Sequence, residues 1–212
     1  MTRILITSGP TREYLDPVRY LSNASSGRMG AALAAAALEA GFEVTVVSGP
    51  VLVEYPTAAE VLRVVTTQDM ADACRAVFPG CRGLIAAAAP CDYRPHTASA
   101  NKLHKTGDGR TLELVETVDV VASLADIRTS QWIVAFALET EDSHLRAMQK
   151  LERKSADLIV VNGPAAIDAE DTSVEVLDRT GASVAVLSGP KQAVAHGIFR
   201  AIDKMLQVRA QQ

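Results

Sequence analysis

Cationic side chains occur in this sequence beside glycines and hydroxyls, a combination that suits the binding of anions. The polar segment over residues 9–30 contains three arginines and leads through Ser25-Ser26-Gly27 into a run rich in alanine. A helix starting there would offer free N–H groups and the positive end of its dipole to a phosphate. The alternative is that Ser25 or Ser26 only caps the helix, and the two roles are compatible.

A second candidate segment is Ala86-Ala87-Ala88-Ala89, where an apolar run ends just before Pro90 and Cys91. Side chains this small let a flat ligand approach the backbone. Asp92 could accept hydrogen bonds from a nucleotide hydroxyl or help to hold Mg²⁺, and the alternative is an Asp that only forms a turn. Cys91 has no histidine in an evident partnering motif, which favours a passive thiol over a nucleophile.

Two pairs of lysines could neutralise phosphate groups. Lys102 and Lys105 lie in a stretch that contains glycine, as a lid over phosphates would, or they belong to a solvated basic loop. Lys150 and Lys154 are four residues apart and therefore share one face of a predicted helix. Near a helix C-terminus they could equally be solvent-exposed charges that the helix dipole favours. The four histidines show no metal-binding spacing, so we predict no zinc site.

The apolar pattern predicts the scaffold that would position these candidates. Short apolar runs alternate with helical stretches, which is typical of βαβ units in a parallel sheet covered on both faces. We therefore predict an α/β fold, a doubly wound Rossmann-like and mostly parallel sheet, as a single domain over residues 1–212. The predicted strands are 4–7, 44–47, 61–65, 84–88, 133–137 and 158–161, and the predicted helices are 28–40, 67–77 with Thr67 as N-cap, 142–154 and 191–207.

Two segments break this alternation. Residues 111–116 alternate between apolar and polar types, and residues 174–187 have the pattern of a β-hairpin around Arg179-Thr180-Gly181-Ala182. We predict that they form a small antiparallel addition, which is a candidate oligomer interface. Ligands of a doubly wound sheet bind beyond the carboxyl ends of its strands, and the polar candidate segments above all lie there.

Composition disfavours several classes of function. With 48% hydrophobic and 22% charged residues, the chain is typical of globular proteins rather than of disordered ones. A net charge of −4 disfavours a general nucleic-acid or anionic-membrane surface, and no apolar run is long enough to span a bilayer. Three cysteines without CxxC spacing and no targeting signal predict a protein of the reducing cytoplasm.

Together these segments resemble the phosphopantothenoylcysteine synthetases, ligases of coenzyme A biosynthesis, over nearly the whole chain. The most specific motif is the run from Asp16-Pro17-Val18-Arg19 through Asn23 to Ser25-Ser26-Gly27-Arg28-Met29-Gly30. Three further motifs follow in the family's order: Ala88-Ala89 with Asp92-Tyr93-Arg94, Phe136-Ala137 with Glu139-Thr140, and residues 157–162 after Lys150 and Lys154.

The resemblance implies a reaction in two steps. The carboxylate of 4′-phosphopantothenate attacks the α-phosphate of CTP to give an acyl-cytidylate and pyrophosphate, and cysteine then forms the amide and releases CMP. Such chemistry brings anionic groups together, so Mg²⁺ and lysines must neutralise charge. The resemblance also implies a homodimer and CTP rather than ATP. Because the chain starts at the synthetase strand, without a decarboxylase half, we expect no flavin.

The family's residue roles, carried over to matching positions, give the predicted site. Asn23, which would hold the acyl intermediate, and Lys102, which would stabilise phosphate charge, would be catalytic. The substrate-binding residues would be Arg19, Asn23, Ser25, Ser26, Gly27 and Ala89. The nucleotide-binding residues would be Ala86, Ala87, Ala88, Asp92, Lys102, Val118, Asp119, Val120, Val121, Phe136, Lys150 and Lys154, and no metal ligand is assigned.

The sequence departs from the family at several places, including Asn162-Gly163 and Pro90-Cys91, and two of the departures lie in predicted nucleotide-binding segments. Lys102-Leu103-His104-Lys105 has a histidine where the family's lid is basic, and Thr117-Val118-Asp119-Val120 replaces Asn-Pro-Asp-Ile. These departures keep open a catalytically silent nucleotide-binding module. An NAD(P)-dependent reductase on the same fold is the other alternative, disfavoured because neither G-x-G-x-x-G directly after the first strand nor Tyr-x-x-x-Lys is present.

Overall fold

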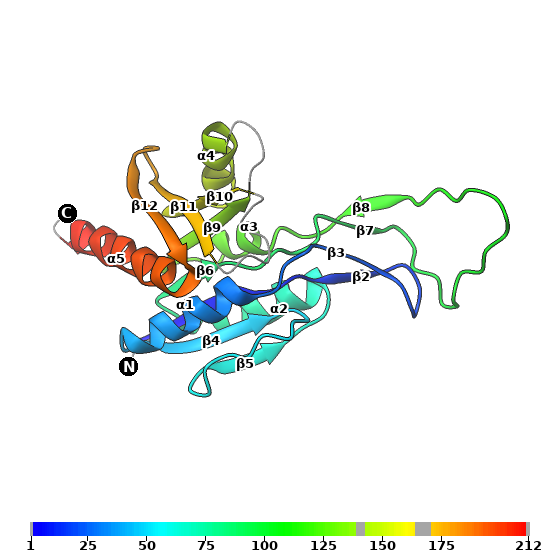
Figure 1. Ribbon diagram of the computed structural model, residues 1–212, viewed down its shortest axis with the longest axis horizontal. Coiled ribbons are helices and arrows are strands. Elements are labelled where there is room, and N and C mark those ends of the chain that lie inside the picture. The colour runs from blue at the N-terminus through cyan, green and yellow to red at the C-terminus, as the bar shows by residue number, and fades with distance from the viewer. Residues whose placement is uncertain (1, 139–142, 164–170, 211–212) are drawn as a thin grey trace.

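The computed structural model describes residues 2–138, 143–163 and 171–210, and an eight-stranded sheet lies at its centre (Figure 1). The strands of this sheet are β1 (Arg3–Ser8), β4 (Glu43–Ser48), β5 (Glu60–Arg63), β6 (Gly83–Ala86), β9 (Trp132–Leu138), β10 (Leu158–Asn162), β11 (Asp171–Asp178) and β12 (Ser183–Pro190). The helices are α1 (Arg28–Glu39), α2 (Thr67–Val77), α3 (Val120–Ala125), α4 (Ser143–Arg153) and α5 (Lys191–Ala210), and residues 78–80 form a short 3₁₀ turn.

The strand order confirms the predicted doubly wound fold. Six strands pair in parallel in the order β5-β4-β1-β6-β9-β10, and β11 and β12 extend the sheet beyond β10 with antiparallel pairing. The first three parallel strands of the chain build outward from β1 in one direction, and the next three build outward in the other. The order therefore reverses between β1 and β6, and such a reversal is where doubly wound sheets bind ligands.

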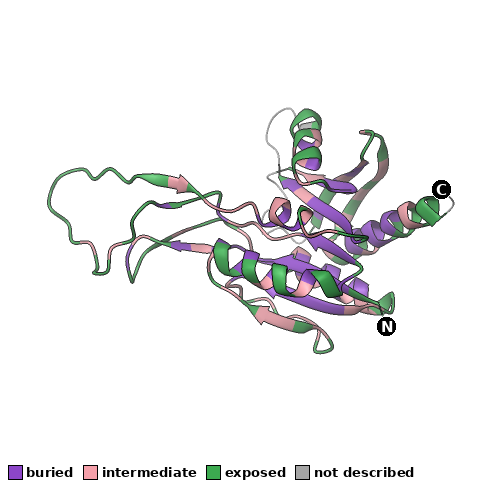
Figure 2. Ribbon diagram, turned by 180° about the vertical axis from the view of Figure 1, so that it is seen from behind, coloured by how far each residue is buried: buried purple, intermediate pink, exposed green. Residues whose placement is uncertain are grey.

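Helices cover both faces of the sheet because the strands are apolar on both faces. In β1, Ile4 and Ile6 pack against the layer formed by α1 and α5, whereas Leu5 packs against the layer formed by α2, α3 and α4. All three side chains are fully buried, and Figure 2 shows the central strands in purple between the two layers. Continuous apolar runs of this kind are typical of parallel strands with both faces covered.

A long arm projects from the sheet and was not predicted as such (Figure 1). It consists of two antiparallel ribbons, β2 (Arg12–Tyr14) with β3 (Tyr20–Ser22) and β7 (Tyr93–Pro95) with β8 (Leu114–Glu116), and residues 96–113 form its tip. Part of the polar segment over residues 9–30, for which no strand was predicted, is therefore a ribbon. The two antiparallel segments expected to form one addition are separate, because β8 belongs to the arm whereas β11 and β12 join the main sheet.

The N-caps of two helices differ from those suggested by the sequence, although α1 starts at Arg28 as predicted. Thr66, not Thr67, caps α2: its side chain accepts a hydrogen bond from the Asp69 backbone N–H, and the Asp69 carboxylate accepts one from the Thr66 N–H. Neither Ser25 nor Ser26 caps α1, because Gly27 occupies the cap position in the left-handed region, with φ 77° and no side-chain cap. A capping interaction is thus present at α2 and absent at α1.

Other boundaries shift by a few residues. The six-residue helix α3 was not predicted, the third parallel strand is shorter than expected, and the last helix extends to Ala210. Residue 142 of the predicted helix 142–154, and Glu139-Thr140 of the third family motif, lie outside the described residues. None of the helices that the structure describes combines the length and the hydropathy needed to span a bilayer.

Candidate active site

The loops after β1 and β6 run side by side at the reversal of strand order. Pro10 and Ala89 form a parallel bridge, and the Ala89 N–H donates to the Gly9 carbonyl at 2.9 Å. Beside this bridge, at the carboxyl ends of β6 and β9, lies a cavity of about 420 Å³. That volume lies within the range of small-molecule sites.

The cavity gathers most of the predicted nucleotide-binding residues, all except Ala87 and Lys102. Ala86, Ala88 and Phe136 contribute apolar surface, whereas Asp92 and Lys150 contribute charge. The lining residues are Thr7, Ala86, Ala88, Pro90, Cys91, Asp92, Tyr93, Glu116, Thr117, Val118, Asp119, Val120, Val121, Ala135, Phe136, Lys150, Arg153 and Lys154. A flat apolar wall beside several cations can accept a ligand that has an aromatic ring and phosphates.

Asp119 organises the charged wall of the cavity. Its Oδ1 accepts hydrogen bonds from the N–H groups of Val121 and Ala122 at the start of α3, each at 3.1 Å. Lys154 Nζ donates to both carboxylate oxygens at 2.7 and 2.9 Å. Burial opposes ionisation, yet the hydrogen bond and charge of Lys154 hold the pKa of Asp119 below its usual value. The Asp119 carboxylate is therefore ionised at neutral pH.

Asn23 lies at the junction between the arm and the sheet. Its Nδ2 donates to the carbonyl oxygens of Ala89 at 3.2 Å and Pro90 at 2.8 Å. These bonds fix the orientation of the amide, which leaves its oxygen as the group that could face a substrate. The structure thus brings together two predicted substrate-binding residues, Asn23 and Ala89, next to the cavity.

Three threonine hydroxyls fix the segment that carries Asp92, and no sequence pattern pointed to them; Thr11 and Thr67 are buried and Thr117 is half-buried. Thr11 Oγ1 accepts from the Cys91 N–H at 2.8 Å and lies 2.8 Å from Thr67 Oγ1. Thr117 Oγ1 donates to the Cys91 carbonyl at 2.5 Å. Burial raises the pKa of the Cys91 thiol, which supports a passive thiol over a nucleophile.

The start of α1 lies against the sheet and outside the set of cavity-lining residues. A Cβ on Gly30 would lie 2.0 Å from Ser8 Oγ, so only glycine allows the helix to approach β1 this closely. Ser25 and Ser26 are half-buried, and the Gly27 carbonyl accepts a hydrogen bond from Ser8 Oγ at 3.2 Å. The close helix–sheet contact is therefore present, and the binding of an anion there stays a prediction.

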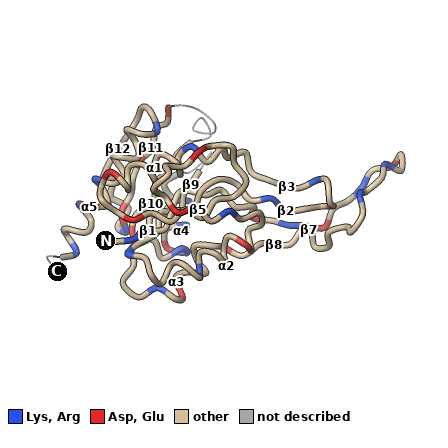
Figure 3. Tube along the Cα trace, turned by 90° about the horizontal axis from the view of Figure 1, so that it is seen from below, with Lys and Arg blue, Asp and Glu red and all other residues tan. Residues whose placement is uncertain are grey.

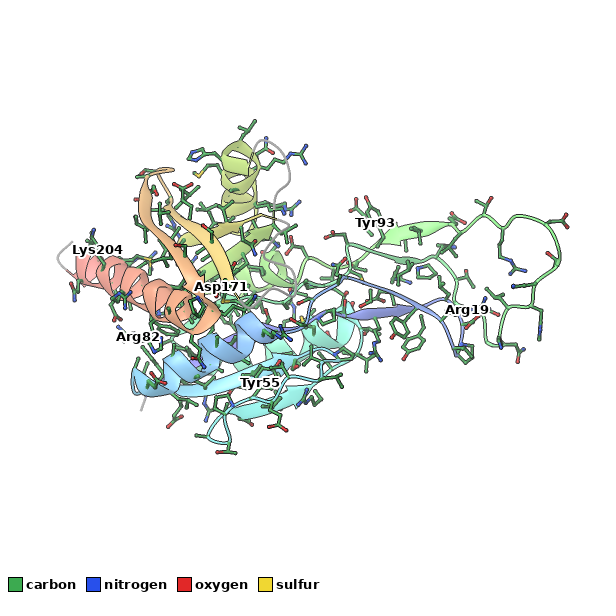
Figure 4. The ribbon with its side chains drawn as sticks, in the orientation of Figure 1. Arg19, Tyr55, Arg82, Tyr93, Asp171 and Lys204 are labelled. Atoms are coloured by element: carbon green, nitrogen blue, oxygen red, sulfur yellow. The ribbon has the colours of Figure 1, made fainter. Side chains whose placement is uncertain are left out.

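Arg19 lies on the arm, away from the cavity of the same chain (Figure 4), and Lys102 belongs to the tip of the arm and does not line the cavity. Arg19 Nε donates to Asp16 Oδ2 at 2.9 Å, and its Nη2 donates to the Leu103 carbonyl at 2.6 Å. Lys102, the neighbour of Leu103, is exposed. The structure therefore does not bring these two predicted site residues to the others within one chain. Figure 3 shows Lys and Arg both on the body and along the arm to its tip.

Burial would raise the pKa of Asp16, but hydrogen bonds outweigh it. The Arg19 guanidinium and the N–H groups of Leu103, Val18 and Arg19 all donate to this carboxylate and hold its pKa well below its usual value. Asp16 is therefore ionised at neutral pH and joins the β2–β3 turn to the segment after Lys102.

Several cavity-lining residues were missed by the sequence predictions, notably Glu116, Thr117 and Arg153. Thr117 adjoins the predicted residue Val118 and Arg153 adjoins the predicted Lys154, whereas Glu116 lies two residues before Val118. This nearness in sequence was the only available signal. Within the ranges that the structure describes, no group of three or more His, Cys, Asp or Glu side chains is placed to hold a metal ion.

Comparison with known proteins gives a consistent result. Residues 1–206 match the family model DFP, the DNA/pantothenate metabolism flavoprotein C-terminal domain. A coenzyme A biosynthesis bifunctional protein CoaBC of Vibrio vulnificus (strain YJ016) is 45% identical over 162 residues, 75% of this chain and 40% of that protein. The CoaBC of Vibrio cholerae is 38% identical over 211 residues, 96% of this chain and 53% of that protein. The chain thus spans about half the length or less of these curated relatives.

Solved structures agree with the sequence comparisons. The crystal structure of the C-terminal domain of a coenzyme A biosynthesis bifunctional protein CoaBC has a TM-score of 0.81 and 35% identity, over 97% of this chain and 96% of that one. A Cab2 mutant in complex with phosphopantothenate-cysteine has a TM-score of 0.79 at 18% identity, over 99% of this chain and 88% of that one. At this lower identity the likeness concerns the fold.

Proposed function

We propose a function from the premise that the chain belongs to the DNA/pantothenate metabolism flavoprotein C-terminal domain family, as its match over residues 1–206 shows. The chain is a ligase of coenzyme A biosynthesis that joins 4′-phosphopantothenate to L-cysteine with CTP as co-substrate. The observation that carries this proposal is the cavity at the end of β6, where Asp92, Phe136 and Lys154 line one space and Asn23 is held against Ala89 beside it. We propose that this ligase acts in the cytoplasm, in keeping with the three free, buried cysteines of the chain.

The proposed chemistry has two balanced steps. A carboxylate oxygen of phosphopantothenate forms a bond to the α-phosphorus of CTP while the bond from that phosphorus to the bridging oxygen breaks, and pyrophosphate leaves. The cysteine amine then bonds to the activated carbonyl carbon, CMP leaves, and the amine proton passes to solvent. In this scheme Lys150 and Lys154 offset phosphate charge, the apolar wall holds the base, and the Asn23 amide oxygen faces the acyl group.

Magnesium fits this cavity as an ion that arrives with the substrate. Asp92 and Glu116 both line the wall, and carboxylate oxygens suit Mg²⁺, which commonly binds through one or two carboxylates together with substrate phosphates. When bound, the ion would neutralise charge on the phosphates. Asp92 would be its first protein partner, and the absence of flavin stays a prediction.

A homodimer would complete the site, and the arm is its best-supported interface. A two-stranded ribbon is marginally stable alone in water, yet the arm presents exposed apolar side chains. These exposed residues are Tyr14, Val18, Tyr20, Tyr93, Leu112 and Leu114. A second copy that covers them would also bring its Arg19 and Lys102 toward a neighbouring cavity. Light scattering should give twice the mass of 22.5 kDa, and a monomer at micromolar concentration would refute the dimer.

Release of pyrophosphate is the direct test of the ligase. With phosphopantothenate, Mg²⁺ and CTP, we expect pyrophosphate release that requires phosphopantothenate, and an amide product only when cysteine is added. Replacing CTP with ATP tests the choice of nucleotide. Binding of nicotinamide cofactor without release would support the reductase, and binding of CTP without turnover would support the silent module.

Two substitutions separate the steps. Asn23→Asp should impair amide formation more than pyrophosphate release, because the acyl group is held in the second step, and an equal loss in both would refute this role. Lys102→Gln should slow the first step by about tenfold to a hundredfold, as expected when a charge that stabilises phosphate is removed. An unchanged first step would remove Lys102 from the chemistry.

A further inference from the structure

Two neighbouring cations share one carboxylate on the wall of the cavity. Lys154 Nζ donates to both carboxylate oxygens of Asp119, and Arg153 Nη2 lies 3.6 Å from Asp119 Oδ2. All three side chains line the same cavity, and Lys150 from one turn earlier lines it as well. Lys150, Arg153 and Lys154 therefore place three cations beside the one carboxylate of Asp119, and Arg153 belongs to this group although it was not a predicted site residue.

The pair of Asp119 and Lys154 is only partly hydrated. The Lys154 side chain is 16% exposed and that of Asp119 is 29% exposed, so their attraction is screened less than that of a surface pair. Asp119 also holds the start of α3 through two backbone N–H groups. The carboxylate therefore stays on the wall whether or not the cations remain with it, and an incoming anion must compete with it for them.

A polyphosphate is the kind of anion that can win this competition. It offers several charged oxygens to each cation, whereas Asp119 offers two oxygens and one negative charge. The Arg153 side chain lines the cavity and is 63% exposed, so it can turn from Asp119 toward an incoming phosphate without losing much buried contact. Resting on the proposed function, which places a nucleoside triphosphate in this cavity, we propose that Arg153 and Lys154 are paired phosphate-binding cations and that Asp119 is the internal counter-ion they leave when a polyphosphate binds.

This counter-ion weakens the binding of the nucleotide and of the pyrophosphate product alike. It thereby favours departure of the product, because Asp119 takes back the cations as the phosphates leave. Asp119 is a positioning residue, since it acts on phosphate only through Lys154 and Arg153. Its removal should consequently tighten the binding of polyphosphate, whereas a merely structural residue would weaken binding or leave it unchanged.

Calorimetry with inorganic tripolyphosphate in magnesium-free buffer tests the proposal. Asp119→Asn removes the negative charge but retains a residue type that caps helices well. We expect it to bind tripolyphosphate about threefold to tenfold more tightly than the wild type, as loss of a partly screened competing charge predicts. Arg153→Gln should bind about threefold to tenfold more weakly. Arg146→Gln is the matched control, because Arg146 lies exposed on the same helix outside the cavity lining.

Each outcome tests a separate part of the proposal. Equal or weaker binding by both Asp119→Asn and Asp119→Ser, a second variant that can cap α3, overturns the counter-ion. An affinity of Arg153→Gln that matches Arg146→Gln overturns the role of Arg153. A wild type that releases pyrophosphate from CTP but does not bind tripolyphosphate overturns this inference and leaves the ligase intact. Tighter binding by Asp119→Asn, with no pyrophosphate release by the wild type, supports the cation site and refutes the ligase.

Discussion

The sheet body and the arm each contain a buried carboxylate, and the two differ in where their hydrogen-bond donors come from. Asp157 and Asp16 are 2% and 1% exposed, and each is surrounded by donors. The donors of Asp157 come from distant segments of the body, whereas most donors of Asp16 lie within three residues of it. Asp157 thus connects several distant segments of the body. Asp16, although equally buried, stabilises only the β2–β3 turn and the neighbouring segment at Leu103.

The contacts of Asp157 make this contrast concrete. Its Oδ2 accepts from Arg128 Nη2 at 2.7 Å and from the Ile133 N–H at 2.8 Å, and Arg179 Nη2 lies 2.5 Å from its Oδ1. Arg209, near the end of α5, also donates to Oδ1. The carboxylate thereby joins the approach to β9, the β11–β12 turn and the last helix at the amino ends of β9 and β10, away from the carboxyl ends where the cavity lies.

The largest expected effect is that of Asp157→Asn. It removes the charge at the centre of this cluster while keeping the shape of the side chain, and we expect about 3 kcal/mol of lost stability, because a buried ion pair loses one partner. Urea denaturation followed by circular dichroism measures this loss. Asp16→Asn should leave the urea midpoint nearly unchanged but speed hydrogen exchange at the Leu103 and Arg19 amides. Similar midpoint shifts for the two variants would contradict the contrast.

Two glycine substitutions, one in the body and one in the arm, compare the two regions again with a smaller expected loss of stability. A Cβ on Gly83 would lie 2.1 Å from ring atoms of Trp132, whose side chain is fully buried, whereas a Cβ on Gly109 at the tip of the arm would meet no atom within 4 Å. We expect Gly83→Ala to cost about 2 kcal/mol through overpacking and Gly109→Ala to change little. Thermal unfolding of both variants checks this, and a stable Gly83→Ala protein would show that the ring can move aside.

The sequence predicted the body far better than the arm, for physical reasons. Runs such as Ile4-Leu5-Ile6 are apolar on both faces of a strand, and this pattern depends on no distant residue. β2 and β3 have three residues each, and β2 is stabilised by pairing with β3 rather than by a periodic apolar face. The helix α3 escaped prediction because six residues are too few to show a helical period.

The residues of the candidate site also fall into those that a local sequence pattern predicted and those that it did not. Spacing predicted that Lys150 and Lys154 share a face, and both line the cavity. Arg153 was missed because adjacent helical positions point in different directions, and its long side chain returns to Asp119 only through tertiary geometry. Arg19 and Lys102 were predicted from the family resemblance, but no local sequence pattern predicts that the arm holds them away from the cavity. Their place in the chemistry depends on the second copy that we propose.

The smallest expected effect compares one histidine–glutamate pair in each region. On the body, His196 Nε2 lies 2.7 Å from Glu39 Oε2 and joins α5 to α1. On the arm, His96 Nδ1 lies 3.9 Å from Glu113 Oε2. The hydrogen bonds that His196 donates to the Glu39 carboxylate and to the Gln192 carbonyl raise the pKa of His196 above its ordinary value of 6.5. A raised pKa means that the stabilisation is fully present below pH 6.5 and is lost as the pH rises through the folded-state value.

This sign gives a measurable pH dependence. His196→Gln should lower Tm at pH 5.5 by at most about 3 °C, because the pair is exposed, and the difference from the wild type should shrink toward pH 8.5. Glu39→Gln should reproduce this profile, and His96→Gln should not shift Tm at either pH, because a pair on the arm does not bridge elements of the body. A difference that grows with pH would reverse the assigned sign. An effect of His96→Gln as large as that of His196→Gln would mean that the arm unfolds together with the sheet.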